Sequence, residues 1–280
     1  MTTCYINGKY KPLSKASISI TDRGFQFSDG VYEVIAIYHT KLVDELLHLN
    51  RLKTSLNNLG IKIQLSIKQI QKISLKIQKI NNVSNGIIYI QITRGDQHPR
   101  DHKYLVNLKP NIIIYSIKKD FKKLDNLATK GVKASLYPDI RWLRSDIKSI
   151  SLLGNVMASN HAKKKNSHEA ILYDQKNHIT EGNSSSIWMI KKNVCYTHPL
   201  TYRILKGCTR DKLINILKLH KYTFKEQVFS IKSLMNADEV FMTSATNFIM
   251  PITKIDNRKI ANGKPGLFSL KLREEFINSI

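Results

Sequence analysis

Lys148 is the residue of this chain whose type and position most readily support covalent chemistry. It lies in residues 139–158, where an extended stretch is expected to end and a helix to begin. The neutral amine of a lysine is a nucleophile that forms Schiff bases with carbonyl compounds. Because Lys and Arg together make up 45 of the 280 residues, a single lysine is most often a solvated surface group. Whether Lys148 is a nucleophile or a surface lysine therefore has to be judged from the residues that accompany it.

Two turns and one arginine have the composition of a phosphate-binding site. Residues 206–213 indicate a glycine turn entering a helix, with Thr209 as the candidate N-cap, and the N–H groups at a helix start attract phosphate. A polar turn at residues 243–246 ends an apolar strand and offers hydroxyl and N–H groups. Arg51 lies on an expected helix as either a solvated charge or a phosphate clamp. Each feature taken alone also fits an ordinary cap, turn or surface charge.

Four further residues have side chains suited to a cofactor ring and a substrate carboxylate. Glu181 precedes a small polar stretch, where it is either a solvated turn carboxylate or the partner of a protonated ring nitrogen. Arg100 and His102 follow a strand on a loop able to reach a substrate carboxylate. The phenol of Tyr32 could join them, although a half-buried sheet tyrosine is the more common explanation.

The elements that must position these residues are indicated by hydrophobic periodicity. Residues 31–38 and 86–93 have the β-branched and aromatic content of strands. Leucines at 49, 52, 56 and 59 predict a helix from about residue 46 to a stop at Gly60, and isoleucines between residues 67 and 77 predict a second one. In the second half, strands are expected at residues 170–173, 186–190 and 239–242, with helices after Lys148, after Thr209 and from Gly266.

The lysine-rich residues 116–130 are interpreted as a linker between two domains. We place the boundary near residue 120, which gives an N-terminal domain of residues 1–120 and a C-terminal domain of residues 121–280. Strands mixed with helices in both halves indicate an α+β fold with mixed sheets. A ligand is then expected in the cleft between the two domains.

Composition limits the class of protein. The three cysteines are odd in number and far apart, which fits a reducing cytoplasm better than a disulfide framework. The nine histidines lack metal-binding spacing, so no metal is expected, and no apolar run has the length of a signal peptide core or a membrane span. We therefore expect a cytoplasmic protein that binds neither metal nor membrane.

The net charge of +24 is typical of nucleic-acid or acidic-surface binders. The lysines, however, are spread from Lys9 to Lys271, and no RNA- or DNA-binding motif accompanies them. A lysine-rich composition imposed on an ordinary enzyme is the favoured interpretation, and a basic nucleic-acid or surface binder remains a remote alternative.

Five motifs in combination give the chain a specific resemblance to a known family. They are residues 22–34, 139–158, 180–186, 205–210 and 241–246. In content, order and spacing they resemble the fold-type IV pyridoxal-phosphate aminotransferases, and among these the bacterial D-amino acid (D-alanine) aminotransferases, from Tyr5 to about Phe276. The resemblance implies a two-domain fold with pyridoxal 5'-phosphate in the interdomain cleft.

The resemblance also implies roles for individual residues. Lys148 would form the Schiff base with the cofactor and move the proton, and Glu181 would pair with the pyridine nitrogen. The residues implied in holding the phosphate or packing on the ring are Arg51, Leu205, Cys208, Thr209, Ser244 and Ala245. The residues implied in trapping the substrate carboxylate are Tyr32, Arg100 and His102, the last two reaching in from the other subunit of a homodimer.

The implied reaction is transamination of D-alanine with 2-oxoglutarate, giving pyruvate and D-glutamate for peptidoglycan. Two residues depart from the family's pattern, since Ala245 lacks an expected hydroxyl and Cys208 replaces an aliphatic residue. Both changes bear on cofactor affinity rather than on the type of reaction. The branched-chain L-amino acid aminotransferases and 4-amino-4-deoxychorismate lyase, which share the fold, remain alternatives.

Overall fold

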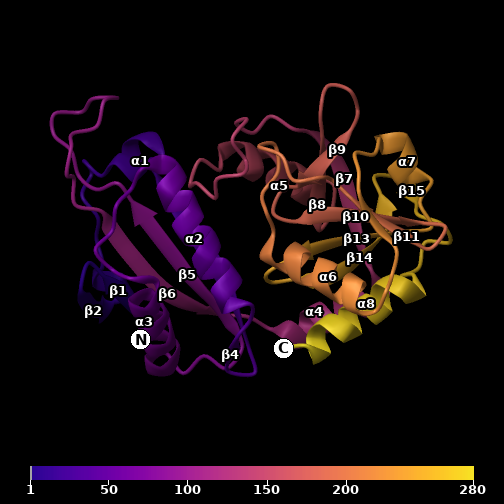
Figure 1. Cartoon of the computed structure of the whole chain (residues 1–280), viewed down its shortest axis with the longest axis horizontal. Helices are drawn as coiled ribbons and strands as arrows, with labels where there is room; N and C mark the ends of the chain where they lie inside the picture. Colours follow the sequence, from indigo (N-terminus) through magenta and orange to yellow (C-terminus); the bar gives the residue numbers. More distant parts are fainter. Residues whose placement is uncertain (1) are drawn as a thin grey trace. The chain divides into compact units, whose positions relative to one another are not determined.

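The computed structural model describes residues 2–280, which divide into two compact units (Figure 1). Unit 1 runs to Phe121 and also includes Ile147–Ser151, and unit 2 comprises Lys122–Asp146 and Leu152–Ile280. The segment that carries Lys148 therefore packs with unit 1, whereas the sequence interpretation placed it in the C-terminal domain. The reason is local: Ser149 forms an antiparallel bridge with Val31, and the Ile147 side chain is buried in the core of unit 1.

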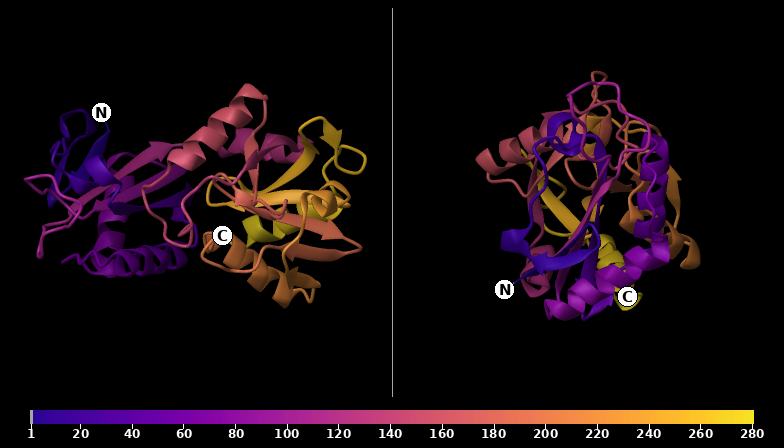
Figure 2. Two further views of the ribbon diagram at one scale, coloured as in Figure 1. Left: turned by 90° about the horizontal axis from the view of Figure 1, so that it is seen from above. Right: turned by 90° about the vertical axis from the view of Figure 1, so that its left-hand side faces the viewer.

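Unit 1 is a six-stranded antiparallel sheet in the order β2-β1-β6-β5-β3-β4, with helices α2 and α3 on one face (Figures 1 and 2). Its strands are β1 (Thr3–Ile6), β2 (Lys9–Pro12), β3 (Gly30–Tyr38), β4 (Lys41–Leu42), β5 (Gly86–Thr93) and β6 (Asn111–Lys118). Its helices are the 3-10 turn η1 (Leu13–Lys15), α1 (Arg23–Phe27), α2 (Glu45–Leu59) and α3 (Ile67–Ile80).

The core of unit 1 follows from two periodicities. Successive side chains of a strand point to opposite faces, so Val31, Ile35 and Ile37 of β3 share the face that packs against the helices. Helix α2 presents Leu49, Leu52 and Leu56 to that face, and it ends at Gly60 in the left-handed conformation. The strand and the helix expected from the sequence are both confirmed here.

Unit 2 is a mixed nine-stranded sheet in the order β12-β11-β10-β13-β14-β7-β8-β9, with β15 on β14. Its strands are β7 (Val132–Pro138), β8 (Glu169–Tyr173), β9 (Ile179–Gly182), β10 (Ser186–Lys191), β11 (Val194–Thr197), β12 (Phe224–Glu226), β13 (Glu239–Ser244), β14 (Phe248–Ile255) and β15 (Arg258–Lys259). Its helices are α4 (Phe121–Lys130), α5 (Leu153–Lys164), α6 (Cys208–Leu219), α7 (Ile231–Met235) and α8 (Leu267–Asn278). Parallel pairs such as β7 with β8 occur beside antiparallel ones, which confirms the expected mixed sheet.

The expected linker at residues 116–130 is wrong, because those residues form the end of β6 and then helix α4. The lysines at 122, 123 and 130 are exposed, while Phe121 and Ala128 on the same helix are buried. The stretch is therefore an amphipathic helix whose polar face is rich in lysine. None of the helices among residues 2–280 has the length and apolar character needed to cross a bilayer.

Candidate active site

Lys148 is fixed in unit 1 by backbone hydrogen bonds on both of its sides. Its carbonyl oxygen accepts from Tyr32 N at 3.0 Å, and two residues later Ile150 N donates to Gly30 O at 3.1 Å. The Lys148 N–H donates to Ser55 Oγ of α2 at 3.2 Å. This short bridge to β3 replaces the direct strand-to-helix junction expected from the sequence, since helix α5 begins only at Leu153. The Lys148 Nζ lies 4.1 Å from the ring centroid of Tyr32.

Arg51 is part of a buried cluster with Glu33 and His48. Its Nε donates to Glu33 Oε1 at 2.7 Å, and its second terminal nitrogen donates to Glu33 Oε2 at 2.9 Å. His48 Nδ1 lies 2.8 Å from the same Oε2. Arg51 and Ser55 are four residues apart on α2, so both lie on the face that meets the Lys148 segment. Arg51 is thus a rigidly held cation and not a solvated helix charge.

The charge state of this cluster follows from its contacts. Burial alone would raise the pKa of Glu33, but the nearby charge of Arg51 and hydrogen bonds from His48 and Arg51 lower it to about 2. Burial lowers the pKa of His48 from its ordinary value. Sequence reasoning missed both residues. The available signal was that Glu33 occupies the core-facing side of β3, where an ionised carboxylate requires partners.

Arg100 and His102 lie on the exposed loop between β5 and β6. The Arg100 guanidinium carbon is 4.3 Å from the Phe27 ring centroid, and the His102 ring centroid is 5.2 Å from that of Phe27. Tyr32 stacks instead on Tyr89, with centroids 6.0 Å apart. Within one chain, Arg100 and His102 therefore share Phe27 as their aromatic neighbour, whereas Tyr32, the third residue expected to trap a substrate carboxylate, packs on Tyr89.

Glu181 of unit 2 lies in strand β9 and is 4% exposed, so it is not the solvated turn carboxylate of the simpler interpretation. Its Oε1 accepts a hydrogen bond from Arg141, and its carboxylate also accepts from the Leu205 N–H at 3.2 Å. Arg141 in turn donates to both carboxylate oxygens of Asp139, at 2.9 and 2.7 Å. Arg141 and Asp139, whose side chains are 6% and 12% exposed, thus fix the orientation of the buried Glu181.

Burial raises the pKa of Glu181 above its ordinary value, and the Arg141 guanidinium opposes that rise. The pKa of Asp139 is lowered in spite of its burial, because Arg141 bonds to it and carries the opposite charge. A buried carboxylate held in this way is suited to a cationic partner such as a protonated pyridine nitrogen. Arg141 was missed as a functional residue, although it lies in the motif around Lys148.

The start of helix α6 has the features of an anion-binding site. The helix begins at Cys208 with Gly207 as N-cap, so the prediction of Thr209 as N-cap is wrong, and Thr209 is a buried residue of the first turn. The Gly207 backbone takes the extended N-cap conformation without a side chain to cap the first N–H groups. A Cβ built on Gly207 would lie only 3.0 Å from Ser186 Oγ of β10. The absence of a side chain here leaves a small cradle at a twelve-residue helix N-terminus.

The second polar turn lies next to the same part of the sheet. Ser186 of β10 pairs with Thr243 of β13, and Ser244 follows directly as the last residue of β13. The Asn247 N–H donates to Ser244 Oγ at 3.2 Å, and Ala245 lies in the turn that leads into β14. The hydroxyl groups, the backbone N–H groups and the helix N-terminus fit a phosphate group in their chemistry. Residues 2–280 include no group of three or more His, Cys, Asp or Glu side chains placed to hold a metal ion.

The chain is similar in sequence to a known family and to individual relatives within it. Residues 30–255 match the family described as amino-transferase class IV. The chain is 38% identical over 277 residues to a D-alanine aminotransferase of Staphylococcus aureus (strain MSSA476), with 99% of this chain and 97% of that relative covered. It is 39% identical over 276 residues to a D-alanine aminotransferase of Bacillus licheniformis, with 98% and 95% covered.

Solved structures share the fold at lower sequence identity. A branched-chain amino acid aminotransferase of Escherichia coli aligns with a TM-score of 0.92 at 22% identity, covering 99% of this chain and 93% of that one. A hypothetical aminotransferase from Mycobacterium tuberculosis, in a PLP-bound form, aligns with a TM-score of 0.86 at 16% identity, covering 99% and 98%. These structures share the two-domain α+β architecture expected from the motifs.

Proposed function

Because the chain belongs to the class IV aminotransferase family, we propose that it is a pyridoxal-phosphate-dependent aminotransferase of D-amino acids. The reaction is transfer of the amino group of D-alanine to 2-oxoglutarate, giving pyruvate and D-glutamate, which supply D-amino acids for peptidoglycan. The observation that carries the proposal is identity of 38% over almost the full chain to a relative named D-alanine aminotransferase. The surroundings of Lys148 within unit 1, and those of Glu181 and the α6 N-terminus within unit 2, each support it.

When bound, pyridoxal phosphate supplies an aldehyde for the amines and a protonated ring that accepts electrons from the substrate Cα. The Nζ of Lys148 would hold the cofactor through its aldehyde, and the same amine would serve as the general base and general acid that moves the substrate α-proton. Glu181 would pair with the protonated ring nitrogen, and the hydrogen bond from Arg141 holds the Glu181 carboxylate in its orientation.

Other residues of this chain bind the remaining parts of the cofactor. Arg51, the backbone N–H groups of Cys208, Thr209 and Ala245, and the Ser244 hydroxyl bind the phosphate, and Leu205 packs against the ring. The lack of a hydroxyl at Ala245 removes one side-chain contact to the phosphate and leaves the N–H of the turn. The donor set therefore remains sufficient for a dianion, because a helix N-terminus and an arginine carry most of the attraction.

The substrate carboxylate is bound by Tyr32, Arg100 and His102, with Arg100 and His102 contributed in trans by the second copy of a homodimer. The exposure of the loop that carries them, with Val106 84% exposed at its tip, supports a role outside its own subunit. The three buried free cysteines are consistent with a reducing compartment, and we assign the protein to the cytoplasm.

One experiment separates this function from its alternatives. The purified protein with added pyridoxal phosphate is assayed with D-alanine plus 2-oxoglutarate, with L-leucine plus 2-oxoglutarate, and with 4-amino-4-deoxychorismate alone. We expect kcat/KM for D-alanine to exceed that for L-leucine by at least about 100-fold. L-leucine is the more demanding comparison of the two alternatives, because the chain shares its fold with a branched-chain amino acid aminotransferase. Preference for L-leucine, or release of pyruvate from aminodeoxychorismate without an acceptor, would overturn the proposal.

A further inference from the structure

Two buried arginines of unit 1 share a single carboxylate. Asp29 Oδ2 accepts from Arg23 Nε at 2.9 Å and from Arg94 Nε at 2.7 Å. The exposed fractions of the two arginines are only 4% and 7%. Asp29 lies between α1 and β3, and Arg94 directly follows β5, so the trio joins three elements. Burying a cation in this way is unfavourable unless its N–H groups have partners. The other hydrogen-bond partners of Arg23 and Arg94 indicate the role of this trio.

Arg23 uses its remaining donors on the loop that carries Arg100 and His102. One terminal nitrogen donates to the Asp101 carbonyl at 2.6 Å, and the other donates to the His102 carbonyl at 3.0 Å. Gln97 assists, because its Oε1 accepts from the Leu105 N–H at 3.0 Å and its Nε2 donates to the Lys103 carbonyl at 2.9 Å. The loop backbone is therefore bonded to the rest of unit 1 at and around His102.

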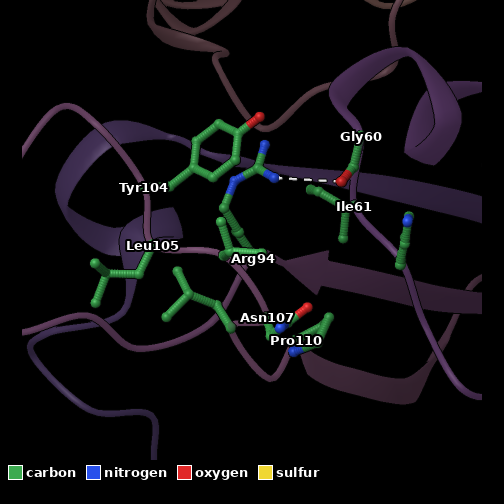
Figure 3. A pocket seen from close by; sticks show the side chains of 10 residues that line it. Gly60, Ile61, Arg94, Tyr104, Leu105, Asn107 and Pro110 are labelled. Carbon is green, nitrogen blue, oxygen red and sulfur yellow. Dashed lines mark hydrogen bonds between the residues drawn. The ribbon is translucent and has the colours of Figure 1, made fainter.

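Arg94 holds the far side of the same loop. Its guanidinium carbon is 3.8 Å from the ring centroid of Tyr104, and it donates to the Leu59 carbonyl at 2.7 Å, as well as to that of Gly60 (Figure 3). These contacts line a pocket between the loop and the end of α2. The loop is thus attached through Arg23 at residues 101–102 and through Arg94 at Tyr104, and both attachments meet at Asp29.

We propose that Arg23 and Arg94, joined through Asp29, are positioning residues that fix Arg100 and His102 and thereby set the affinity of the enzyme for the carboxylate of its substrate. This inference rests on the proposed function. Arg23 bonds a carboxylate and two carbonyls through three separate nitrogens of its planar fork, whereas a lysine has a single nitrogen and cannot span the same three acceptors. The loop is therefore held ready before substrate arrives, which lowers the entropic cost of binding.

The main test replaces Arg23 by lysine, which keeps the charge beside Asp29 and loses the fork. A carboxylate contact made equally in the ground state and in the transition state affects KM more than kcat. We expect KM for D-alanine to rise about 10- to 100-fold with kcat within about threefold, because small misplacements of binding groups have effects of this size. Pyridoxal-phosphate affinity stays unchanged. Arg258→Lys, an exposed arginine of β15, serves as the matched control.

A second readout needs neither substrate nor cofactor. Hydrogen exchange at the Lys103 and Leu105 amides, which bond within the loop, should quicken in R23K by at least about tenfold and stay unchanged in R258K. Asp29→Asn, which keeps an acceptor oxygen but removes the charge shared by the two guanidiniums, provides a second variant with the same expected direction should R23K fold poorly. Wild-type exchange and wild-type KM in both variants would overturn the inference, as would equal losses of kcat and cofactor affinity. Absence of transaminase activity in the wild type would refute the proposed function alone. The exchange measurement would still show whether Arg23 and Asp29 hold the loop.

Discussion

The Nζ of Lys148 lies 4.1 Å from the centre of the Tyr32 ring. The contact exists because the backbone of Lys148 pairs with that of Tyr32, so the two side chains leave neighbouring points of the sheet edge. The face of a tyrosine ring attracts an ammonium group. The expected nucleophile and one member of the expected carboxylate trap are therefore brought together by unit 1 alone, although they are far apart in the sequence.

The first prediction concerns the amine itself. Lys148→Ala should lower kcat for D-alanine transamination by at least about 10³-fold, because a general acid–base group commonly contributes 10²- to 10⁴-fold. Steady-state rates of pyruvate formation provide the measurement. Lys163→Ala, an exposed lysine of α5, is the control and should retain wild-type rates. Substantial turnover by the Lys148 variant would rule out its proposed role.

The second prediction concerns the orientation of Glu181. Arg141→Met removes the cation between Glu181 and Asp139 and leaves two buried carboxylates without their partner. We expect a loss of about 3–5 kcal/mol in the free energy of unfolding and weaker binding of pyridoxal phosphate at neutral pH. Urea unfolding and a cofactor titration measure the two effects. Arg258→Met is the matched control, and a variant that keeps both wild-type values would contradict the assignment.

The third prediction concerns acid stability and Glu33. Its folded pKa of about 2 lies below the ordinary value of 4.5, so its contribution is present above pH 4.5 and is lost as the pH falls toward 2. The difference corresponds to about 3 kcal/mol. Glu33→Gln should therefore be less stable than wild type at pH 7, with the gap closing at low pH. Urea unfolding at pH 7 and pH 3 tests this, with the exposed Glu274→Gln as control.

Glu169 should show the opposite pH dependence. It is buried at the start of β8, and its carboxylate accepts from Ser184 N at 3.1 Å in the turn that follows Glu181. Burial raises its pKa from 4.5 to about 7, so the folded state favours the protonated form. Its stabilising contribution is full below pH 4.5 and is lost as the pH rises from 4.5 to 7, by about 3 kcal/mol.

The test for Glu169 is the neutral variant Glu169→Gln. Because a glutamine does not ionise, the variant should lack the decline in unfolding free energy that wild type shows between pH 4.5 and 7. Relative to wild type it gains stability as the pH rises through this range. Thermal unfolding at several pH values measures the slope. Parallel curves for the two proteins would show that Glu169 is ionised in the folded state throughout.

Local patterns in the sequence determined the elements and the family. The spacing of the leucines at 49, 52 and 56 and the content of residues 31–38 predicted α2 and β3, because a buried face repeats with the period of its own element. The five motifs indicated the aminotransferase family, which the relatives confirm. The lysine-rich helix α4 was misjudged as a linker because its apolar face is narrow.

Only the tertiary structure decided which distant residues became partners. Glu33 with Arg51, Asp29 with Arg94, and Arg141 with Glu181 are separated by many residues, and no local period records such a pairing. It also decided that the Lys148 segment packs with unit 1. The backbone bridge between Val31 and Ser149 holds it there, and the hydrogen bonds of such a bridge do not depend on the identity of the side chains. The sequence thus determined which residues are available for chemistry, while the fold determined their burial, their charge partners and hence their orientation, since these depend on long-range packing.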